Sequence, residues 1–174
     1  MIFRTENNME NRQNDPFPDA PKGVGGWLKF FIIILGVFNP IFSLMMTVGE
    51  FQSVEQENPA LLHVDAFVHY KWFSWGVLLV CCILCIDAAY RLWKKHIWKS
   101  VKQAVLTLWI VGPLASAIVS AYICINFGTG AEGQTAAIGG AIFRSLIFAG
   151  IWTAYLLRSK RVRNTYPKEE DLAG

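Results

Sequence analysis

Four cysteines, Cys81, Cys82, Cys85 and Cys124, are the residues of this chain best suited to redox chemistry, and all of them fall inside long apolar stretches. Thiol-disulfide exchange needs thiolates that reach the aqueous phase, whereas burial in an apolar environment keeps a thiol protonated and inert. Cys82 and Cys85 share a helix face, where small apolar packing is the favoured role. The sequence therefore argues against a membrane thiol oxidoreductase.

A second candidate for chemistry is the group His63, Asp65 and His69, between two apolar stretches. Its spacing matches no strong zinc-ligand pattern, so these side chains are interpreted as surface residues. The chain also has no phosphate-binding glycine loop, no nucleophile elbow and no His-Glu-x-x-His motif. We expect neither a metal nor a cofactor, and no enzymatic activity.

Two charges lie within apolar stretches, Asp87 and Arg144. Asp87 precedes Arg91 by four residues, the spacing of an ion pair on one helix face, and we predict that pair near the inner membrane interface. Arg144 lies 14 residues before Arg158, roughly 21 Å along a helix. At that depth it needs a polar partner inside the protein, or it must extend outward along lipid to the headgroups.

Three polar side chains share the predicted depth of Arg144 or lie one turn from it. We predict an intramembrane polar site made of Arg144, Asn39, Ser43 and Ser116. In this site the guanidinium donates hydrogen bonds to those side chains, or to the carbonyls freed by Pro40 and Pro113, and joins the first, third and fourth spans. The same group could instead form a polar pocket for an anionic ligand.

Four apolar runs organise the chain, in which apolar residues make up 53% and charged residues 17% of 174. They cover residues 30–48, 72–90, 104–127 and 136–157. Each run is long enough to cross a bilayer as a helix, the structure that satisfies its own backbone hydrogen bonds in lipid. We predict an all-α integral membrane four-helix bundle with spans at about 27–48, 71–92, 104–127 and 135–157.

Lysine and arginine are distributed unevenly between the segments that flank these runs. Fourteen of the sixteen lie in residues 1–29, 91–102 and 158–168, whereas the loop 49–71 has Lys71 alone and the loop 128–135 has none. Because basic residues mark cytoplasmic loops, both termini are predicted to be cytoplasmic. The distribution of the bases is more informative than the net charge of +3, and we expect no nucleic-acid partner.

Local patterns predict further detail. Residues 1–26 are polar and contain three prolines, which predicts a disordered cytoplasmic extension, and residues 158–174 form a basic and then acidic tail. Pro40 and Pro113 predict kinks, and Asn58-Pro59 predicts a short interfacial helix over residues 60–70. Small residues at four-residue spacing in the last two spans predict a closely packed antiparallel hairpin.

Two motifs near the ends of the chain carry a resemblance. Gly25-Gly26-Trp27-Leu28 and Ile151-Trp152-x-x-Tyr155-Leu156-x-x-Ser159-Lys160-Arg161-Val162-x-x-Thr165-Tyr166 resemble the YdgK-like family of bacterial four-span membrane proteins, an uncharacterised domain-of-unknown-function family. The resemblance covers about residues 22–166 and implies a four-helix fold in the bacterial inner membrane, with no assigned activity. Where that family usually has Phe after the closing Thr, this chain has Tyr166.

The closing motif also predicts a membrane-anchoring or partner-docking region. Trp152 and Tyr155 would lie at the inner headgroup level, with Lys160, Arg161 and Arg163 just beyond them. Aromatic rings favour that level, and bases beyond it attract anionic lipid of the inner leaflet. The alternative is that the same bases dock a cytoplasmic partner.

Taken together, these patterns favour a non-enzymatic integral membrane protein that acts through interactions. It would serve as an accessory or scaffolding subunit or as a homo-oligomer, with the bilayer and a second copy or another membrane protein as partners. The alternative is a small oligomeric transporter or channel with a polar pocket around Arg144, since four spans are few for one polar pathway.

Overall fold

The computed structural model describes the backbone of residues 23–128 and 132–167, and the side chains of 23–128 and 139–167. Within these residues the chain is helical, with no strand. Residues 1–22 of the predicted disordered extension (1–26) and residues 168–174 of the predicted tail (158–174) lie outside the described residues.

The four predicted spans are confirmed as four long helical rods. The first comprises α2 (Trp27–Ile33), a π turn η1 (Ile34–Phe38) and α3 (Asn39–Glu57), and the second is α4 (Asp65–Lys94). The third comprises α5 (Trp98–Trp109), a π turn η3 (Ile110–Leu114) and α6 (Ala115–Phe127). The fourth is α7 (Glu132–Arg158), followed by the short α8 (Lys160–Thr165).

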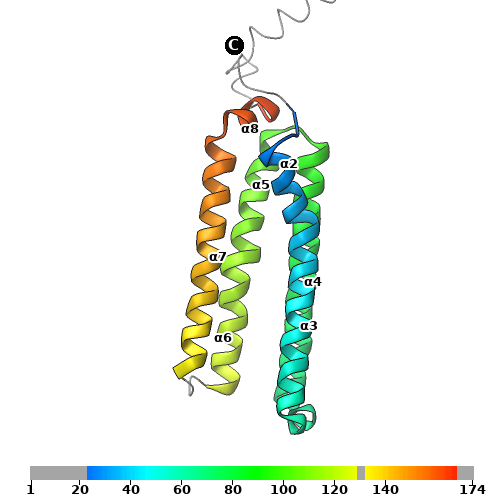
Figure 1. Ribbon diagram of the computed structural model, residues 1–174, viewed down its shortest axis with the longest axis vertical. Helices are drawn as coiled ribbons and strands as arrows, with labels where there is room; N and C mark the ends of the chain where they lie inside the picture. Colours follow the sequence, from blue (N-terminus) through cyan, green and yellow to red (C-terminus); the bar gives the residue numbers. More distant parts are fainter. Residues whose placement is uncertain (1–22, 129–131, 168–174) are drawn as a thin grey trace, which may run out of the picture.

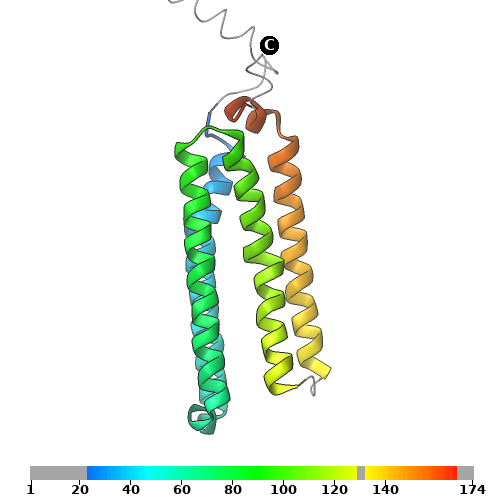
Figure 2. The ribbon, with the colours of Figure 1, turned by 180° about the vertical axis from the view of Figure 1, so that it is seen from behind.

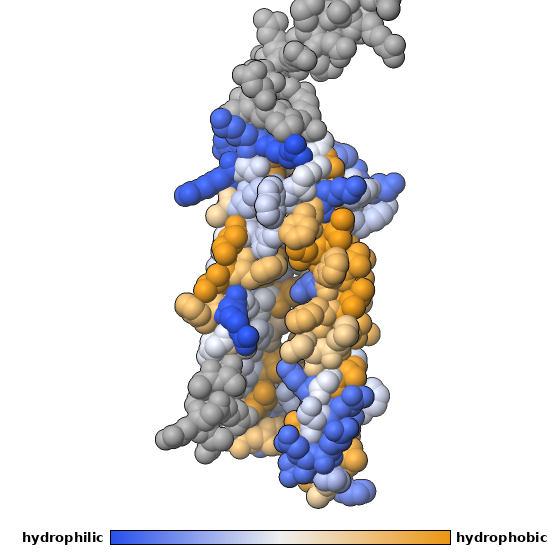
Figure 3. All heavy atoms as spheres, in the orientation of Figure 1, coloured by the Kyte–Doolittle hydropathy of each residue, from blue (hydrophilic) through white to orange (hydrophobic). Residues whose placement is uncertain are grey.

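The surface of the rods is apolar. In the most apolar window of each rod no more than 22% of the residues are buried inside the protein. Figure 3 shows the remaining apolar side chains over the middle of the molecule, with hydrophilic residues near its two ends. A helix that is apolar all round is suited to lipid, so the chain is a multi-pass membrane protein.

The rods run the length of the molecule as two pairs, α3 beside α4 and α6 beside α7 (Figures 1 and 2). The α2 helix, α8 and the turn at residues 95–97 meet at one end, named here the α8 end. The 3-10 helix η2 (Pro59–His63) lies at the opposite end, named the loop end.

Both prolines are accommodated by π turns. The η1 turn directly precedes Asn39 and Pro40, and η3 contains Pro113. Proline lacks an N–H and its ring collides with the carbonyl four residues earlier, and a π turn lengthens the hydrogen-bond step from four residues to five. At both positions where a kink was predicted, the helix therefore contains a wider π turn. At the first of them, α2 is tilted relative to the axis of α3 (Figure 1).

The predicted interfacial helix over residues 60–70 is wrong in extent. Pro59 does begin a helix, but η2 ends at His63, and the extended backbone of Val64 separates it from α4. The first span also continues to Glu57, beyond the predicted end at residue 48. Its last turns are held against α4 by the Lys71–Glu55 ion pair and by the Phe51–Phe67 ring contact, centroids 6.2 Å apart.

The hydrophobic core is concentrated at the α8 end. It joins α2, α4, α5, α7 and α8 through side chains such as Phe31, Leu92, Val101, Leu156 and Tyr166, all fully buried. The loop end is held instead by aromatic rings, with Phe73 and Tyr122 stacked at 4.4 Å between α4 and the third span. The two ends are therefore closed by different kinds of contact.

The predicted close packing of the last two spans is confirmed over part of its length. A Cβ placed on Gly112 would lie 3.6 Å from the Cβ of Ser145, and Ala149 is fully buried. Trp109 also donates a hydrogen bond from Nε1 to Thr153 Oγ1, at 3.2 Å. Ala141, further toward the loop end, is instead exposed to a cavity.

The close packing of η1 on α4 at Gly36 predicts that a larger residue at this position lowers stability. A Cβ on Gly36 would lie 2.6 Å from Ala89 Cβ, so Gly36→Ala must push η1 away from α4 and should lower the unfolding free energy by about 1 to 3 kcal/mol. Gly76→Ala is the matched control, because nothing lies within 4 Å of its added methyl group. That change should be neutral or raise stability by about 0.5 to 1 kcal/mol. Equal thermal shifts for both variants in detergent would contradict this packing.

Candidate functional site

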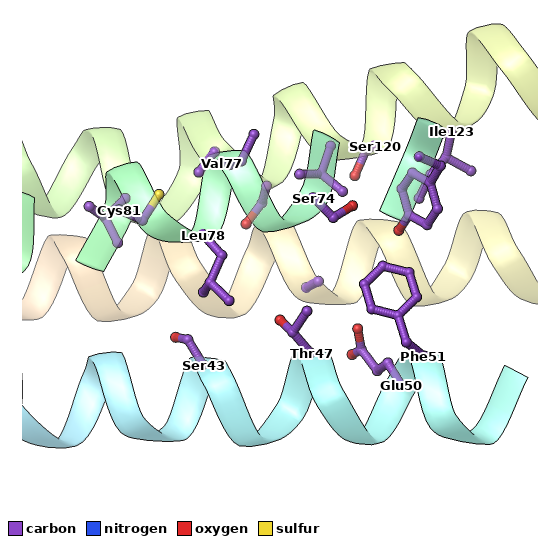
Figure 4. A pocket seen from close by; sticks show the side chains of 16 residues that line it. Ser43, Thr47, Glu50, Phe51, Ser74, Val77, Leu78, Cys81, Ser120 and Ile123 are labelled. Carbon is purple, nitrogen blue, oxygen red and sulfur yellow. The ribbon is translucent and has the colours of Figure 1, made fainter. Parts of the chain in front are cut away.

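A cavity of about 410 Å³ lies toward the loop end, between α3, α4 and α6. Its wall carries an unusual number of hydroxyl groups for a membrane-spanning region. They belong to Ser43, Thr47, Tyr70, Ser74, Ser116 and Ser120. The rest of the wall is mostly apolar, and Figure 4 shows Val77, Leu78 and Cys81 facing Ser43 and Thr47 across the space.

One carboxylate faces this cavity. Glu50 is exposed at its edge, and Figure 4 shows the carboxylate beside Thr47 and the Phe51 ring. Within the described part of the chain Glu50 forms neither a hydrogen bond nor an ion pair, while Lys71 is paired with Glu55. The hydroxyl oxygen of Ser74 is buried and meets no hydrogen-bond partner of ordinary geometry among the same residues.

A second cavity, of about 370 Å³, adjoins the first on the side of the α8 end. It brings together Arg144, Asn39 and Ser43 from the predicted polar site, whereas Ser116 lines the larger cavity. The two cavities share Ser43 and Val111 on their walls. The predicted residues therefore line two adjoining cavities between the helix pairs.

The hydrogen bonds predicted for Arg144 are wrong. Over residues 23–128 and 139–167 its guanidinium bonds to neither the three predicted side chains nor the proline-freed carbonyls, and its Nε donates to Gly140 O at 3.3 Å. Helical side chains lean toward the N-terminus of their helix, which turns Arg144 toward the loop end and leaves it exposed. Depth along the helix axis alone does not determine this direction.

Two other predicted members of that site have hydrogen-bond partners other than Arg144. Asn39 Nδ2 donates to Cys85 Sγ at 3.3 Å, and Ser116 Oγ donates to Gly112 O at 2.8 Å. Cys85 was predicted only as a small packing residue, and it is fully buried in the core. Its role as acceptor for Asn39 depends on the packing of η1 on α4, which the sequence does not reveal.

The predicted ion pair is present. Arg91 Nε lies 2.9 and 2.8 Å from the two carboxylate oxygens of Asp87. Gln103 was not predicted, and its Nε2 donates to Asp87 Oδ2 at 2.8 Å, so the group joins α4 to α5. The short connection between α4 and α5, residues 95–97, turns the chain back so that Gln103 lies opposite Asp87. A short loop between two predicted spans could have indicated this contact from the sequence.

The closing motif packs inside the protein to a greater extent than predicted. Trp152 stacks at a tilt on Phe31, with centroids 4.5 Å apart, and both Trp152 and Tyr155 border the core. Arg161 lies over the N-terminal glycines, with a guanidinium nitrogen 2.9 Å from where a Gly25 Cβ would be. Lys160 is exposed, while Arg161 and Arg163 are half-buried. Their part in lipid anchoring or partner docking stays a prediction.

The two end motifs meet in space. Gly23 N donates to Thr165 Oγ1 at 3.1 Å, and Thr165 Oγ1 donates to Arg161 O at 2.7 Å. Tyr166 is fully buried, stacks on His96 and donates its hydroxyl to Leu92 O. Burial raises the pKa of this phenol well above its ordinary value, so it remains a donor throughout the physiological range.

No group of three or more histidine, cysteine, aspartate or glutamate side chains within residues 23–128 and 139–167 is placed to hold a metal ion. His63, Asp65 and His69 are all exposed. Among the described residues, polar groups suited to a binding function gather at the two adjoining cavities and at the α8 end.

Comparison with known proteins places the chain in a family. The model of the family DUF2569, described as a protein of unknown function, matches residues 21–167, which is most of the chain. The chain therefore belongs to that family. No curated protein and no solved structure matches it.

The Tyr166 contact yields a second prediction. Tyr166→Phe keeps the buried ring but leaves Leu92 O without its donor, so it should lower the unfolding free energy by about 1 kcal/mol. Tyr90→Phe is the control, since Tyr90 is exposed. Chemical denaturation in detergent compares the two, and equal stability of both variants with the wild type would show that the hydroxyl contributes nothing.

Proposed function

We propose that this member of the DUF2569 family is a non-enzymatic protein of the bacterial inner membrane that acts by binding. It would serve as an accessory or scaffolding subunit, or as a homo-oligomer, and its occupied surface would include the larger cavity. The observation that supports this role is the group of hydroxyl groups and one carboxylate around that cavity.

Polar groups at membrane depth are costly unless something satisfies them. Hydrocarbon offers no hydrogen bonds, so hydroxyls and a carboxylate between spans mark a place that water, a ligand or a partner helix fills. At the α8 end the core closes the bundle, whereas toward the loop end the helix pairs leave this space between them. A binding role uses that asymmetry and requires no catalytic group.

The proposed location has both termini in the cytoplasm. Lys94, Lys95, Lys99 and Lys102 are exposed at the α8 end, as is Lys160. Exposed bases beside spans favour the cytoplasmic side and attract anionic lipid of the inner leaflet. The partners are thus this lipid and a membrane protein or second copy, with no nucleic acid.

Reporter fusions test this topology. A reporter after Gly174 should give a cytoplasmic signal, and one inserted near Glu57, in the region with few bases, should give a periplasmic signal. A periplasmic signal from the C-terminal fusion would overturn the orientation.

A rival function is a small oligomeric transporter or channel. It is favoured by the position of the two cavities side by side, with Ser43 on both walls and Arg144 on the wall of the second. Such a pathway also needs several copies, because four spans are few for one polar route. The number of copies in the assembly and the identity of the protein that contacts the cavity therefore distinguish the accessory or scaffolding role from the transporter or channel.

Photo-crosslinking in native membranes examines the binding role. Met46 lies beside the Ser43–Thr47 face of α3 and Met45 on the opposite face, since successive helical residues turn by about 100°. Both are exposed, at 49% and 69%. Benzoylphenylalanine in place of Met46 should yield protein adducts, and in place of Met45 it should yield lipid adducts only.

The size of the adduct separates the candidates further. A dimer-sized product supports a homo-oligomer, and a product with a different protein supports an accessory subunit. Absence of any protein adduct at Met46, together with a monomer in mild detergent, would count against both the binding role with a protein partner and the oligomeric transporter.

A further inference from the structure

We propose that the larger cavity is a binding site for an amphipathic organic cation, meaning a protonated amine or onium group carried on an apolar body. This inference rests on the proposed binding function and specifies a chemical class of ligand for it. It is carried by the charge, the aromatic rings and the apolar wall of the cavity.

The charge of the lining is negative. Of the sixteen described lining residues, Glu50 is the one acidic side chain, and none of the sixteen is a lysine, arginine or histidine. Glu50 is without an ion-pair partner among the residues described, and the nearby Lys71 is already held by Glu55. Glu50 is therefore available to form an ion pair with a cation that enters the cavity.

Aromatic rings adjoin the carboxylate. Phe51 follows Glu50 directly, and its ring lies 5.8 Å from that of Tyr70 at 62°. The faces of such rings attract cations, and here Lys71 Nζ already lies 5.8 Å from the centre of Phe51. The edge of the cavity therefore combines a carboxylate with rings suited to a positively charged group.

The polarity of the wall changes along the cavity. Glu50 lies seven residues from Ser43 on α3, roughly 10 Å along the helix. On α4, opposite this stretch, Figure 4 shows the apolar Val77 and Leu78, with Ser74 nearer to Glu50. An apolar body would lie along this wall, with its cationic group toward the loop end. The volume of about 410 Å³ falls within the range of small-molecule sites.

An anionic ligand suits the larger cavity poorly. Arg144 lines the neighbouring cavity and is not part of this wall, and its Nε is bonded within its own helix. An anion beside Glu50 would meet a charge of the same sign at short range, and this repulsion opposes its binding. The chemistry therefore favours a cation over an anion of the same shape.

Two probes of nearly equal shape and opposite charge allow a direct test. The full chain in nanodiscs of neutral phosphatidylcholine would be titrated with tetraphenylphosphonium and, separately, with tetraphenylborate, with empty nanodiscs as blanks. We expect saturable binding of the phosphonium, and binding of the borate at least about tenfold weaker.

Charge variants assign the binding to the carboxylate. Glu50→Gln should weaken phosphonium binding on the order of tenfold, and Glu50→Lys should shift the preference toward the borate. Glu57→Gln is the matched control, since Glu57 is an exposed carboxylate at the end of the same helix and outside the cavity wall. It should change the affinity less than about twofold. Thermal melts of each variant establish that it is folded.

A cavity-filling variant supplies an independent check. Ala115 lines the cavity, and Ala115→Leu adds volume there without altering charge. It should weaken phosphonium binding, whereas Ala154→Leu, on an exposed face of α7, should not.

Unchanged phosphonium binding in Glu50→Gln, or equal binding of phosphonium and borate by the wild type, would overturn the proposal. If phosphonium fails to bind but Met46 still yields protein adducts, the ligand class is wrong and the binding role with a protein partner stands.

Discussion

The hydroxyl of Tyr166, donated to Leu92 O, joins the C-terminal helix to the end of α4, and the rest of the bundle depends on the core around it. In lipid the hydrophobic effect does not draw helices together, so close packing and buried hydrogen bonds must do so. At the α8 end this core holds all four spans. Because that end is closed, the other end can leave a polar space between the helix pairs without loss of the fold.

The sequence was sufficient for features that depend on local spacing. Apolar run lengths give the four spans, and the four-residue spacing of Asp87 and Arg91 gives their ion pair. Arg144 shows where this reasoning fails, because depth along a helix does not fix the direction of a side chain or the rotation of its neighbours. The hydrogen bond from Asn39 to Cys85 likewise depends on how η1 rotates against α4.

The larger cavity was only partly predictable. Ser43 and Ser116 were singled out as polar groups inside spans, but Glu50 was assigned to a loop because the apolar run ends before it. In the structure α3 continues past Glu50, held by the contacts of Phe51 and Glu55 with α4. The length of an apolar run therefore predicts the membrane-spanning part of a helix. The residue at which the helix ends depends in addition on tertiary contacts, here those between the last turns of α3 and α4.

The π turn before Pro40 also sets the rotational phase of the first rod. A π turn holds about one residue more than an α turn, and one residue corresponds to about 100° around a helix. Were η1 an ordinary α turn, every residue of α3 would be rotated by about that angle relative to α2, which the core holds in place. The face bearing Ser43, Thr47 and Glu50 would then turn away from the cavity. The extra residue works as an angular spacer, which uncouples the direction of the polar face of α3 from the anchoring of α2.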